Sequence, residues 1–335
     1  MSTKNPAPPL TAPRPANQRA VQLTNLLRQP LVGPLAALLL AVIVFSLITD
    51  TFLTSYNLSL ILQQSVVVGI LAAAQTLVIL TGGIDLSIGA VAVLGTIVMA
   101  KIGTVHGPWI GLLAAAAVCV AAGTINGALV TVLKLPPFIV TLGTFTAIYA
   151  ATQLYAGSQT YPVRDEPLTF LGNSIGSGAV STTYGVIAML VVYLVVWYAL
   201  TQTAGGRHVY AVGGNAEAAR LVGIKSDRTL LFVYMTAGLI AAVGAWAALG
   251  RIPNADPNAF QNANLETITA VVIGGTSLFG GRGSIMGTLI GMLIVSVLRS
   301  GLTAAGVDAL YQNVATGVLV IAAVALDQFA RRKTG

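Results

Sequence analysis

The sequence predicts an all-α fold, a polytopic membrane bundle of about ten transmembrane helices. Hydrophobic residues make up 56% of the 335-residue chain and charged residues 8%, whereas about 25% of an ordinary soluble domain is charged. The mean hydropathy is +0.84. Apolar runs long enough to cross a bilayer, about 17–25 residues each, recur along almost the whole chain. These observations exclude a soluble globular domain.

The apolar runs predict a transmembrane domain over residues 31–330. We place its spans at 31–49, 58–80, 85–100, 108–133, 138–156, 185–201, 230–249, 267–281, 284–303 and 312–328. Residues 1–30 are polar and rich in proline, and we expect a disordered cytoplasmic tail there. The tail is too long and too neutral for the first part of a signal peptide.

The stretch "LTGGIDLSIG" at 80–89 separates the second span from the third. A continuous helix over 58–100 would extend about 65 Å, far beyond the ~30 Å hydrocarbon core. The chain must therefore turn back, and we expect the turn at 81–83 because glycine adopts positive φ freely. Asp85 is then placed to cap the next helix at the positive end of its dipole. Alternatively Asp85, beside Ser87, faces a water-filled pathway.

The distribution of Lys and Arg predicts the orientation in the membrane. The formal net charge is +7, but the cations are spread singly over short hydrophilic breaks, unlike a nucleic-acid-binding stripe. With the N-terminus inside, 13 of the 17 cations fall in cytoplasmic segments. Both termini are therefore expected in the cytoplasm. The cations outside are Lys101, Arg164, Arg251 and Arg299.

Two hydrophilic segments are long enough for separate tasks. The first, 157–184, is expected outside and contains the charged cluster Arg164, Asp165 and Glu166. This cluster is either part of a solvated loop or a docking surface for an external protein. The second, 202–229, is expected inside and has the residues of a folded segment.

Within the second segment, "GGNAEAARLVGI" at 213–224 predicts one short helix. Asn215 suits the N-cap, Glu217 lies in the first turn, and Arg220 complements the C-terminal end. Gly223 suits the left-handed position after the helix. About seven residues are too few for a stable helix in water. The helix must therefore pack against another protein at the inner face or against its own membrane domain.

Several functions are excluded by what the sequence lacks. There is no G-x-x-x-x-G-K-[ST] motif, so the chain does not cradle ATP in a P-loop and needs a separate energy source. His106 and His208 fall on opposite sides of the predicted membrane, and the only cysteine, Cys119, lies in an apolar run. No catalytic triad, metal site or cofactor is predicted. An ion-coupled secondary transporter usually carries several buried ionisable relays, whereas Asp85 is the one plausible example.

Four motifs together resemble one family, the membrane permeases of ribose- and xylose-type ABC sugar importers. They are "LTGGIDLSIGAVAVLG" (80–95), "GRHVYAVGGNAEAARLVGI" (206–224), "AVVIGGTSLFGGRGSIMGTLIG" (270–291) and "LYQNVATGVLVIAAVALDQ" (310–328). The resemblance extends in order over nearly the whole chain beyond the tail. It implies a type II importer permease in the bacterial inner membrane, similar in fold to the cobalamin permease. It also implies a dimer with a second copy or a paralogue, cytoplasmic ATP-binding subunits and a periplasmic sugar-binding protein.

The resemblance also implies roles for individual residues. The pattern E-A-A-x-x-x-G looks like the coupling helix that inserts into a cleft of the ATPase; with its cap, this set is Asn215, Glu217, Ala218, Ala219, Arg220 and Gly223. The "GGIDLS" and "GGTSLFGGRG" signatures supply glycines for turns or for close helix packing: Gly82, Gly83, Gly274, Gly275, Gly280 and Gly281.

Candidate substrate-pathway residues are polar side chains inside the spans: Gln75, Asp85, Ser87, Thr124, Asn126, Thr141, Thr144 and Gln153. Each has the alternative role of a hydrogen bond between helices. A neutral sugar needs only hydroxyls, amides and small polar gaps, so a sugar is favoured over a branched-chain amino acid or a nucleoside, the substrates of related permeases. An external binding protein selects the substrate in such importers, and the sequence does not identify the sugar.

Overall fold

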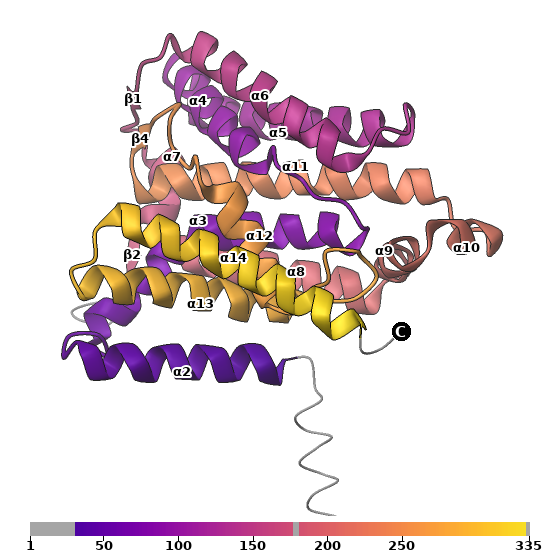
Figure 1. Ribbon diagram of the computed structural model, residues 1–335. Coiled ribbons are helices and arrows are strands. Elements are labelled where there is room, and N and C mark those ends of the chain that lie inside the picture. The colour runs from indigo at the N-terminus through magenta and orange to yellow at the C-terminus, as the bar shows by residue number, and fades with distance from the viewer. Residues whose placement is uncertain (1–30, 177–180, 333–335) are drawn as a thin grey trace, which may run out of the picture.

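The structure is a computed structural model that describes residues 31–176 and 181–332. The predicted tail, 1–30, lies outside the described residues. The described chain is a bundle of helices with four two-residue strands, and most helices run along one common direction (Figure 1). The prediction of an all-α helical bundle is confirmed.

The main helices follow the predicted spans closely. They are α2 (Val32–Ile48), α3 (Ser55–Leu80), α4 (Ile88–His106), α5 (Pro108–Thr131), α6 (Pro137–Ala156), α8 (Tyr184–Gln202), α11 (Ser226–Arg251), α12 (Ala263–Ile273), α13 (Ile285–Ala304) and α14 (Ala309–Arg332). Among the described residues, seven of these are long and apolar enough to cross a membrane. The other three count as shorter apolar helices: α2 (Val32–Ile48), α12 (Ala263–Ile273) and the part Ala309–Ala322 of α14.

One predicted span is wrong in its second half. The range 267–281 was expected to be helical, but α12 ends at Ile273 and a non-helical stretch leads to α13. Gly275 has φ +86°, a left-handed conformation that ends the helix. At 11 residues, α12 is only about 17 Å long, about half of the ~30 Å hydrocarbon core.

The core forms around α3, which is the most buried of the spanning helices. α11 packs on α3, α4 and α5. Small residues allow the close approach of α5 and α11: a Cβ on Gly123 would collide with the Tyr234 carbonyl, and a Cβ on Gly238 with that of Cys119. Cys119 is fully buried, as its apolar surroundings predict.

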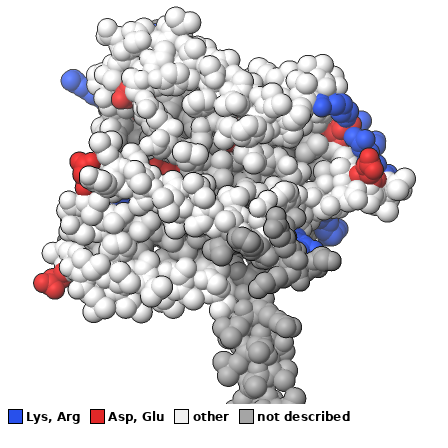
Figure 2. Space-filling view, in the orientation of Figure 1, with Lys and Arg blue, Asp and Glu red and all other residues white. Residues whose placement is uncertain are grey.

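The two ends of the bundle differ. One end carries α9 (Ala204–Gly214) and α10 (Ala216–Leu221). The other carries a small cap, in which β1 (Tyr161–Pro162) pairs antiparallel with β4 (Asn254–Ala255) and β2 (Ser174–Ile175) with β3 (Thr182–Thr183); α7 (Glu166–Thr169) and the 3₁₀ turn Phe170–Gly172 complete it. Figure 2 shows charged side chains mainly at these ends, with a largely uncharged band between them.

The described part of 157–184 is more ordered than a simple loop. Val163, Leu168 and Leu171 are buried, and the Trp246 indole N–H donates to the Pro167 carbonyl at 2.9 Å. The cap is therefore anchored on α11 by apolar and polar contacts.

Candidate functional site

The break between α3 and α4 is a non-helical stretch at 81–87, in which Thr81, Gly83, Asp85 and Ser87 are buried. Gly82 has φ +81°, and its N–H donates to the Ile79 carbonyl at 2.9 Å. Gly83, which was also expected to supply left-handed backbone, does not have positive φ. It is restricted by space instead, because a Cβ there would lie 3.0 Å from the Tyr234 hydroxyl.

The sequence suggested Asp85 as the cap of α4; in the structure Asp85 lies two residues before the N-cap position, with its carboxylate at the start of the helix. Helix α4 begins after Ser87, which occupies the N-cap position. The Asp85 Oδ1 atom instead accepts hydrogen bonds from the Ser87 backbone N–H at 2.7 Å and from the Ser87 hydroxyl at 2.6 Å. The Asn126 side-chain amide in turn donates to Ser87 Oγ at 2.8 Å. These three side chains are all buried and form one chain of hydrogen bonds from the break to α5.

Two further side chains hold the backbone of the break. With its amide oriented to suit its neighbours, Gln75 donates to the Asp85 carbonyl at 3.0 Å and accepts from the Asp85 N–H at 3.2 Å. The Thr141 hydroxyl on α6 donates to the Ile84 carbonyl at 2.9 Å. A non-helical backbone inside a membrane protein needs such partners, because water does not supply them.

The break also contacts two glycine-rich stretches that are distant in sequence. Gly281 donates its N–H to the Leu80 carbonyl at 2.9 Å. A Cβ on Gly213, near the end of α9, would collide with the Leu80 carbonyl and lie 2.7 Å from the Gly281 nitrogen. A Cβ on Gly280 would lie 2.6 Å from the Gly82 nitrogen. We call Gly82, Gly213, Gly280 and Gly281 the glycine junction.

The glycine junction brings together the two glycine signatures and the segment that leads to α10. Tyr210 on α9 adds a hydrogen bond from its hydroxyl to the Gly283 carbonyl at 3.0 Å. Of the predicted turn glycines, Gly275, Gly280 and Gly281 have positive φ, whereas Gly274 does not. Gly274 packs against α13, where a Cβ would collide with the Gly287 backbone.

The short helix α10 begins and ends as its sequence predicts. The Asn215 side chain accepts from the N–H groups of Glu217 and Ala218 at 3.0 and 2.9 Å. At the other end, Gly223 has φ +87°, its N–H donates to the Arg220 carbonyl, and the next N–H donates to the Ala219 carbonyl. This is a Schellman motif.

Helix α10 packs on its own chain by one side only. Ala219 is buried, whereas Leu221 and Val222 are 90% and 77% exposed. The Arg220 guanidinium donates to the Asp227 carboxylate at 2.9 Å, and Lys134 after α5 donates to the same oxygen at 2.7 Å. Two adjacent apolar side chains at the tip are therefore largely exposed in the described chain.

The remaining predicted pathway residues are less connected. Thr124 and Thr144 are half-buried, and each donates to a carbonyl of its own helix. Gln153 donates to the Asn258 side chain at 2.7 Å. Of the predicted pathway residues, Gln75, Asp85, Ser87, Asn126 and Thr141 form hydrogen bonds at the break. Thr124 and Thr144 donate to carbonyls within their own helices instead.

A polar hollow of about 440 Å³ lies between α3, α12 and α13, near the end of the bundle opposite α10. Glu266, which is 7% exposed, accepts from Arg299 at 2.5 Å, and Arg251 lies on the same wall. Sequence reasoning missed this ion pair. One signal in the sequence could have indicated it. Arg251 and Arg299 are two of only four cations that the sequence analysis expects outside the cytoplasm, where Lys and Arg are rare.

Arg164, Asp165 and Glu166 lie on the cap at this opposite end, where Asp165 precedes α7. Arg164 and Glu166 are exposed, and Asp165 is half-buried. Within the described residues, no group of three or more His, Cys, Asp or Glu side chains is arranged to hold a metal ion.

Residues 57–324 match the protein family described as the branched-chain amino acid transport system / permease component. The chain is 46% identical to the fructose import permease protein FrcC of Rhizobium meliloti, covering 90% of this chain and 86% of that protein. It is 38% identical to the ribose import permease protein RbsC of Bacillus subtilis, covering 89% and 92%. Identity to the galactose/methyl galactoside import permease protein MglC of Haemophilus influenzae is 32%, covering 92% and 97%. No solved structure matches the chain.

Proposed function

The chain belongs to the branched-chain amino acid transport system / permease component family, and we propose that it is the membrane subunit of an ABC importer that moves a monosaccharide into the cytoplasm. One observation carries the choice of a sugar. Relatives named as fructose, ribose and galactose import permeases align over about nine tenths of the chain at 32–46% identity. The chain itself is a transporter subunit and not an enzyme.

In this proposal the energy comes from a separate ATP-binding subunit that contacts α10. The exposed Leu221 and Val222 give this subunit an apolar surface, and the cap of Asn215 and the turn at Gly223 fix the direction of the helix. Movement of α10 reaches the break between α3 and α4 through α9, whose Gly213 touches Leu80. The glycine junction is thus the physical connection between the ATPase contact and the membrane core.

The opposite end receives the sugar from a periplasmic binding protein. Arg164, Asp165 and Glu166 on the cap are the charged side chains for this contact. The positive-inside rule supports this orientation, with α10 and both termini in the cytoplasm and the cap outside the inner membrane. A second permease, either a copy or a paralogue, completes the membrane part.

The polar hollow beside Glu266 and Arg299 suits a neutral, hydroxyl-rich solute. Its wall also carries the amides of Gln64 and Gln261 and the ring of Phe260, and a few polar groups that converge in a concave site fix the orientation of such a ligand. Gln75 is eleven residues further along α3 than Gln64, about 17 Å closer to α10. The solute would pass from the hollow toward the break, where Asp85 and Ser87 lie with the other pathway candidates.

Uptake assays test the substrate class. Cells that carry the permease with its binding protein and ATP-binding subunit should accumulate labelled fructose, ribose or galactose, and unlabelled sugar should compete. Labelled leucine is the comparison, because the family description names branched-chain amino acids. Uptake of leucine without uptake of any sugar would establish the amino-acid alternative and overturn the proposal.

Co-purification tests the ATPase contact. Replacing Leu221 and Val222 by glutamine, or Glu217 by lysine, should reduce the recovery of the ATP-binding subunit and lower transport. Leu310→Gln is the matched control, because Leu310 is 74% exposed but lies at the opposite end, at the start of α14. Normal recovery and normal uptake in the α10 variants would leave α10 as an ordinary surface helix.

A further inference from the structure

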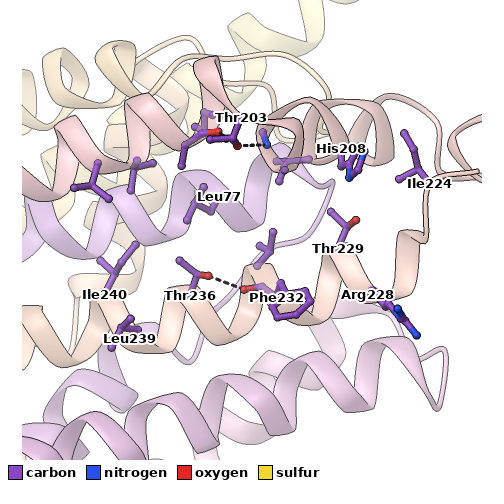
Figure 3. Close-up of a pocket in the computed structure, with 18 of the residues that line it drawn as sticks. Leu77, Thr203, His208, Ile224, Arg228, Thr229, Phe232, Thr236, Leu239 and Ile240 are labelled. Atoms are coloured by element: carbon purple, nitrogen blue, oxygen red, sulfur yellow. Dashed lines mark hydrogen bonds between the residues drawn. The ribbon is translucent and has the colours of Figure 1, made fainter.

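A long apolar groove runs along the outside of the bundle between α8, α9 and α11 (Figure 3). Its volume is about 710 Å³, and its wall is almost entirely apolar, with Leu77 of α3 among the lining residues. No acidic residue lines it. In Figure 3, Leu239 and Ile240 lie toward one end, and Arg228, Thr229 and Ile224 toward the other.

The groove has the length of one leaflet. Along α11 it extends from Arg228 to Ile240, twelve residues and therefore about 18 Å at 1.5 Å per residue. Half of a ~30 Å hydrocarbon core is about 15 Å. A ligand that fills the groove therefore extends from the membrane surface to about the middle of the bilayer.

The sides of the groove are open to the membrane. Val191 and Val195 of α8 are 51% and 60% exposed, and Phe232 and Leu239 of α11 are 62% and 50% exposed. Exposed apolar side chains of this kind on spanning helices face lipid in a membrane protein. An acyl chain of the surrounding bilayer can therefore enter the groove from the side.

The end of the groove near α10 is positively charged. Lys225 and Arg228 line it together with His208 of α9, and both cations are exposed. Neither forms a salt bridge among the described residues. The nearest acid in sequence, Asp227, already accepts from Lys134 and Arg220.

A second hollow of about 410 Å³ adjoins this end of the groove. The two share Gly223, Ile224, Lys225 and Arg228. Arg220, Lys225 and Arg228 line this second hollow together with one acid, Asp227, which is already paired with Lys134 and Arg220. An apolar groove thus continues into a space with a net positive wall, as an acyl chain continues into a phosphate-bearing headgroup.

We propose that this groove binds an anionic phospholipid of the leaflet on the α10 side. One acyl chain lies along α11, and the phosphate is held by Lys225 and Arg228. Basic pockets between spanning helices at the cytoplasmic face are the known form of anionic lipid sites. Free phosphate alone would leave the long apolar part of the groove unused.

A second copy of the chain fits this groove less well than a lipid. In a twofold symmetric pair, the same patch of each copy faces the other. The cations at the α10 end of each copy would then approach one another without an intervening acid from the groove. An anionic lipid matches both the apolar wall and the charge.

The test uses the full-length permease purified in detergent and titrated with phosphatidylglycerol or phosphatidylcholine of equal chain length, with bound lipid counted by native mass spectrometry. Each cation near a membrane surface is worth about 1 kcal/mol, which is about fivefold in affinity. The double variant Lys225→Gln, Arg228→Gln should therefore weaken phosphatidylglycerol binding about tenfold or more and weaken phosphatidylcholine binding much less, because the choline cation offsets the charge of the phosphate in that lipid. Arg164→Gln on the opposite cap is the control and should change neither.

A second experiment fills the groove with a bulky side chain. Thr236, exposed on the groove wall, is replaced by tryptophan, and binding of both lipids should fall while the protein remains folded. Equal binding of both lipids by wild type, with no effect of the charge variant, would overturn the proposal. Loss of the permease dimer in Thr236→Trp would overturn it as well, because the groove would then belong to the contact between copies. Competition of phosphatidylglycerol by inorganic phosphate alone would identify a phosphate site and overturn the lipid assignment.

Discussion

Glycines serve different purposes in the glycine junction and in α10. At Gly213, in the junction, an added Cβ would collide with the Leu80 carbonyl. At Gly223, after α10, no atom lies within 4 Å of an added Cβ, but φ is +87°. The junction glycine is required for space between backbones, and the α10 glycine is required for its backbone conformation.

This difference separates two kinds of structure in one chain. In the junction the backbones approach closely. In the break, Asp85 and Ser87 are buried, and side chains of several helices hold the backbone by hydrogen bonds. A defect in either should therefore affect folding of the whole bundle. Helix α10 contacts its own chain on one side and exposes Leu221 and Val222. A defect there should disturb only α10 and the protein that binds it.

The largest effect is expected for Gly213→Ala. Alanine favours a helix over glycine by about 1 kcal/mol. Overpacking costs about 1–3 kcal/mol and occasionally more, and the collision of the added Cβ is with a backbone atom, the Leu80 carbonyl oxygen, so the collision decides the outcome. The amount of monodisperse protein extracted from the membrane should fall several-fold. Size-exclusion chromatography of the solubilised protein measures it.

Gly214→Ala is the matched control. It lies next in sequence, has no atom within 4 Å of an added Cβ and does not have positive φ, so it should give normal yield. Equal yields for the two variants would mean that the junction is loose enough to accept a methyl group.

Substitution of Asp85 should destabilise the bundle less than Gly213→Ala does. Asp85→Leu removes the acceptor of the Ser87 N–H and hydroxyl, and each unpaired buried group costs about 1–3 kcal/mol. The apparent melting temperature in detergent should drop clearly. Asp85→Asn keeps one side-chain oxygen as acceptor and should lie between Asp85→Leu and wild type.

Transport by folded Asp85→Asn separates the two roles that the sequence left open. Full activity would make Asp85 a structural residue of the break. Normal folding with lost transport would assign the carboxylate to the pathway.

Local signals explain why the helices and α10 could be predicted from the sequence. Apolar length identifies a span without knowledge of its neighbours, and Asn215 and Gly223 act through backbone groups within three or four residues. The same reasoning overextended the span at 267–281, because a glycine-rich apolar stretch has membrane composition whether or not it is helical. The left-handed Gly275 ends α12, and the contacts of 274–283 with α9 and with Leu80 hold the non-helical path that follows.

The long-range part of the site could not be predicted. The glycine junction joins residues near 80, 213 and 281, and no pattern along the chain reports that they meet. The Glu266–Arg299 pair likewise joins two helices, although Arg299 was noticeable as a cation on the side poor in cations. Asp85 was found as an isolated charge, but the hydrogen bond from Asn126 on α5 to its partner Ser87 depends on tertiary packing.

At α10, Gly223→Val should leave the fold intact and impair function. A branched residue in the left-handed region costs more than about 1–2 kcal/mol, which is enough to misdirect the end of a six-residue helix. Melting temperature should stay near that of wild type, whereas recovery of the ATP-binding subunit should fall several-fold. Gly223→Asn should retain most of it, because asparagine tolerates left-handed backbone. A large drop in melting temperature for Gly223→Val would mean that α10 is part of the cooperative core.

The smallest effect is expected for Asn215→Ala, which removes the N-cap of α10. Loss of a cap costs about 1 kcal/mol, and the cost falls on a helix that its own chain supports on one side only. Hydrogen exchange of the Glu217 and Ala218 amides should accelerate about fivefold, while amides in α3 and α11 exchange as in wild type. Asn215→Asp, which keeps a capping oxygen, should restore slow exchange. If protection instead declined in α3 as well, α10 and the glycine junction would unfold together, and the division between the two regions would not hold.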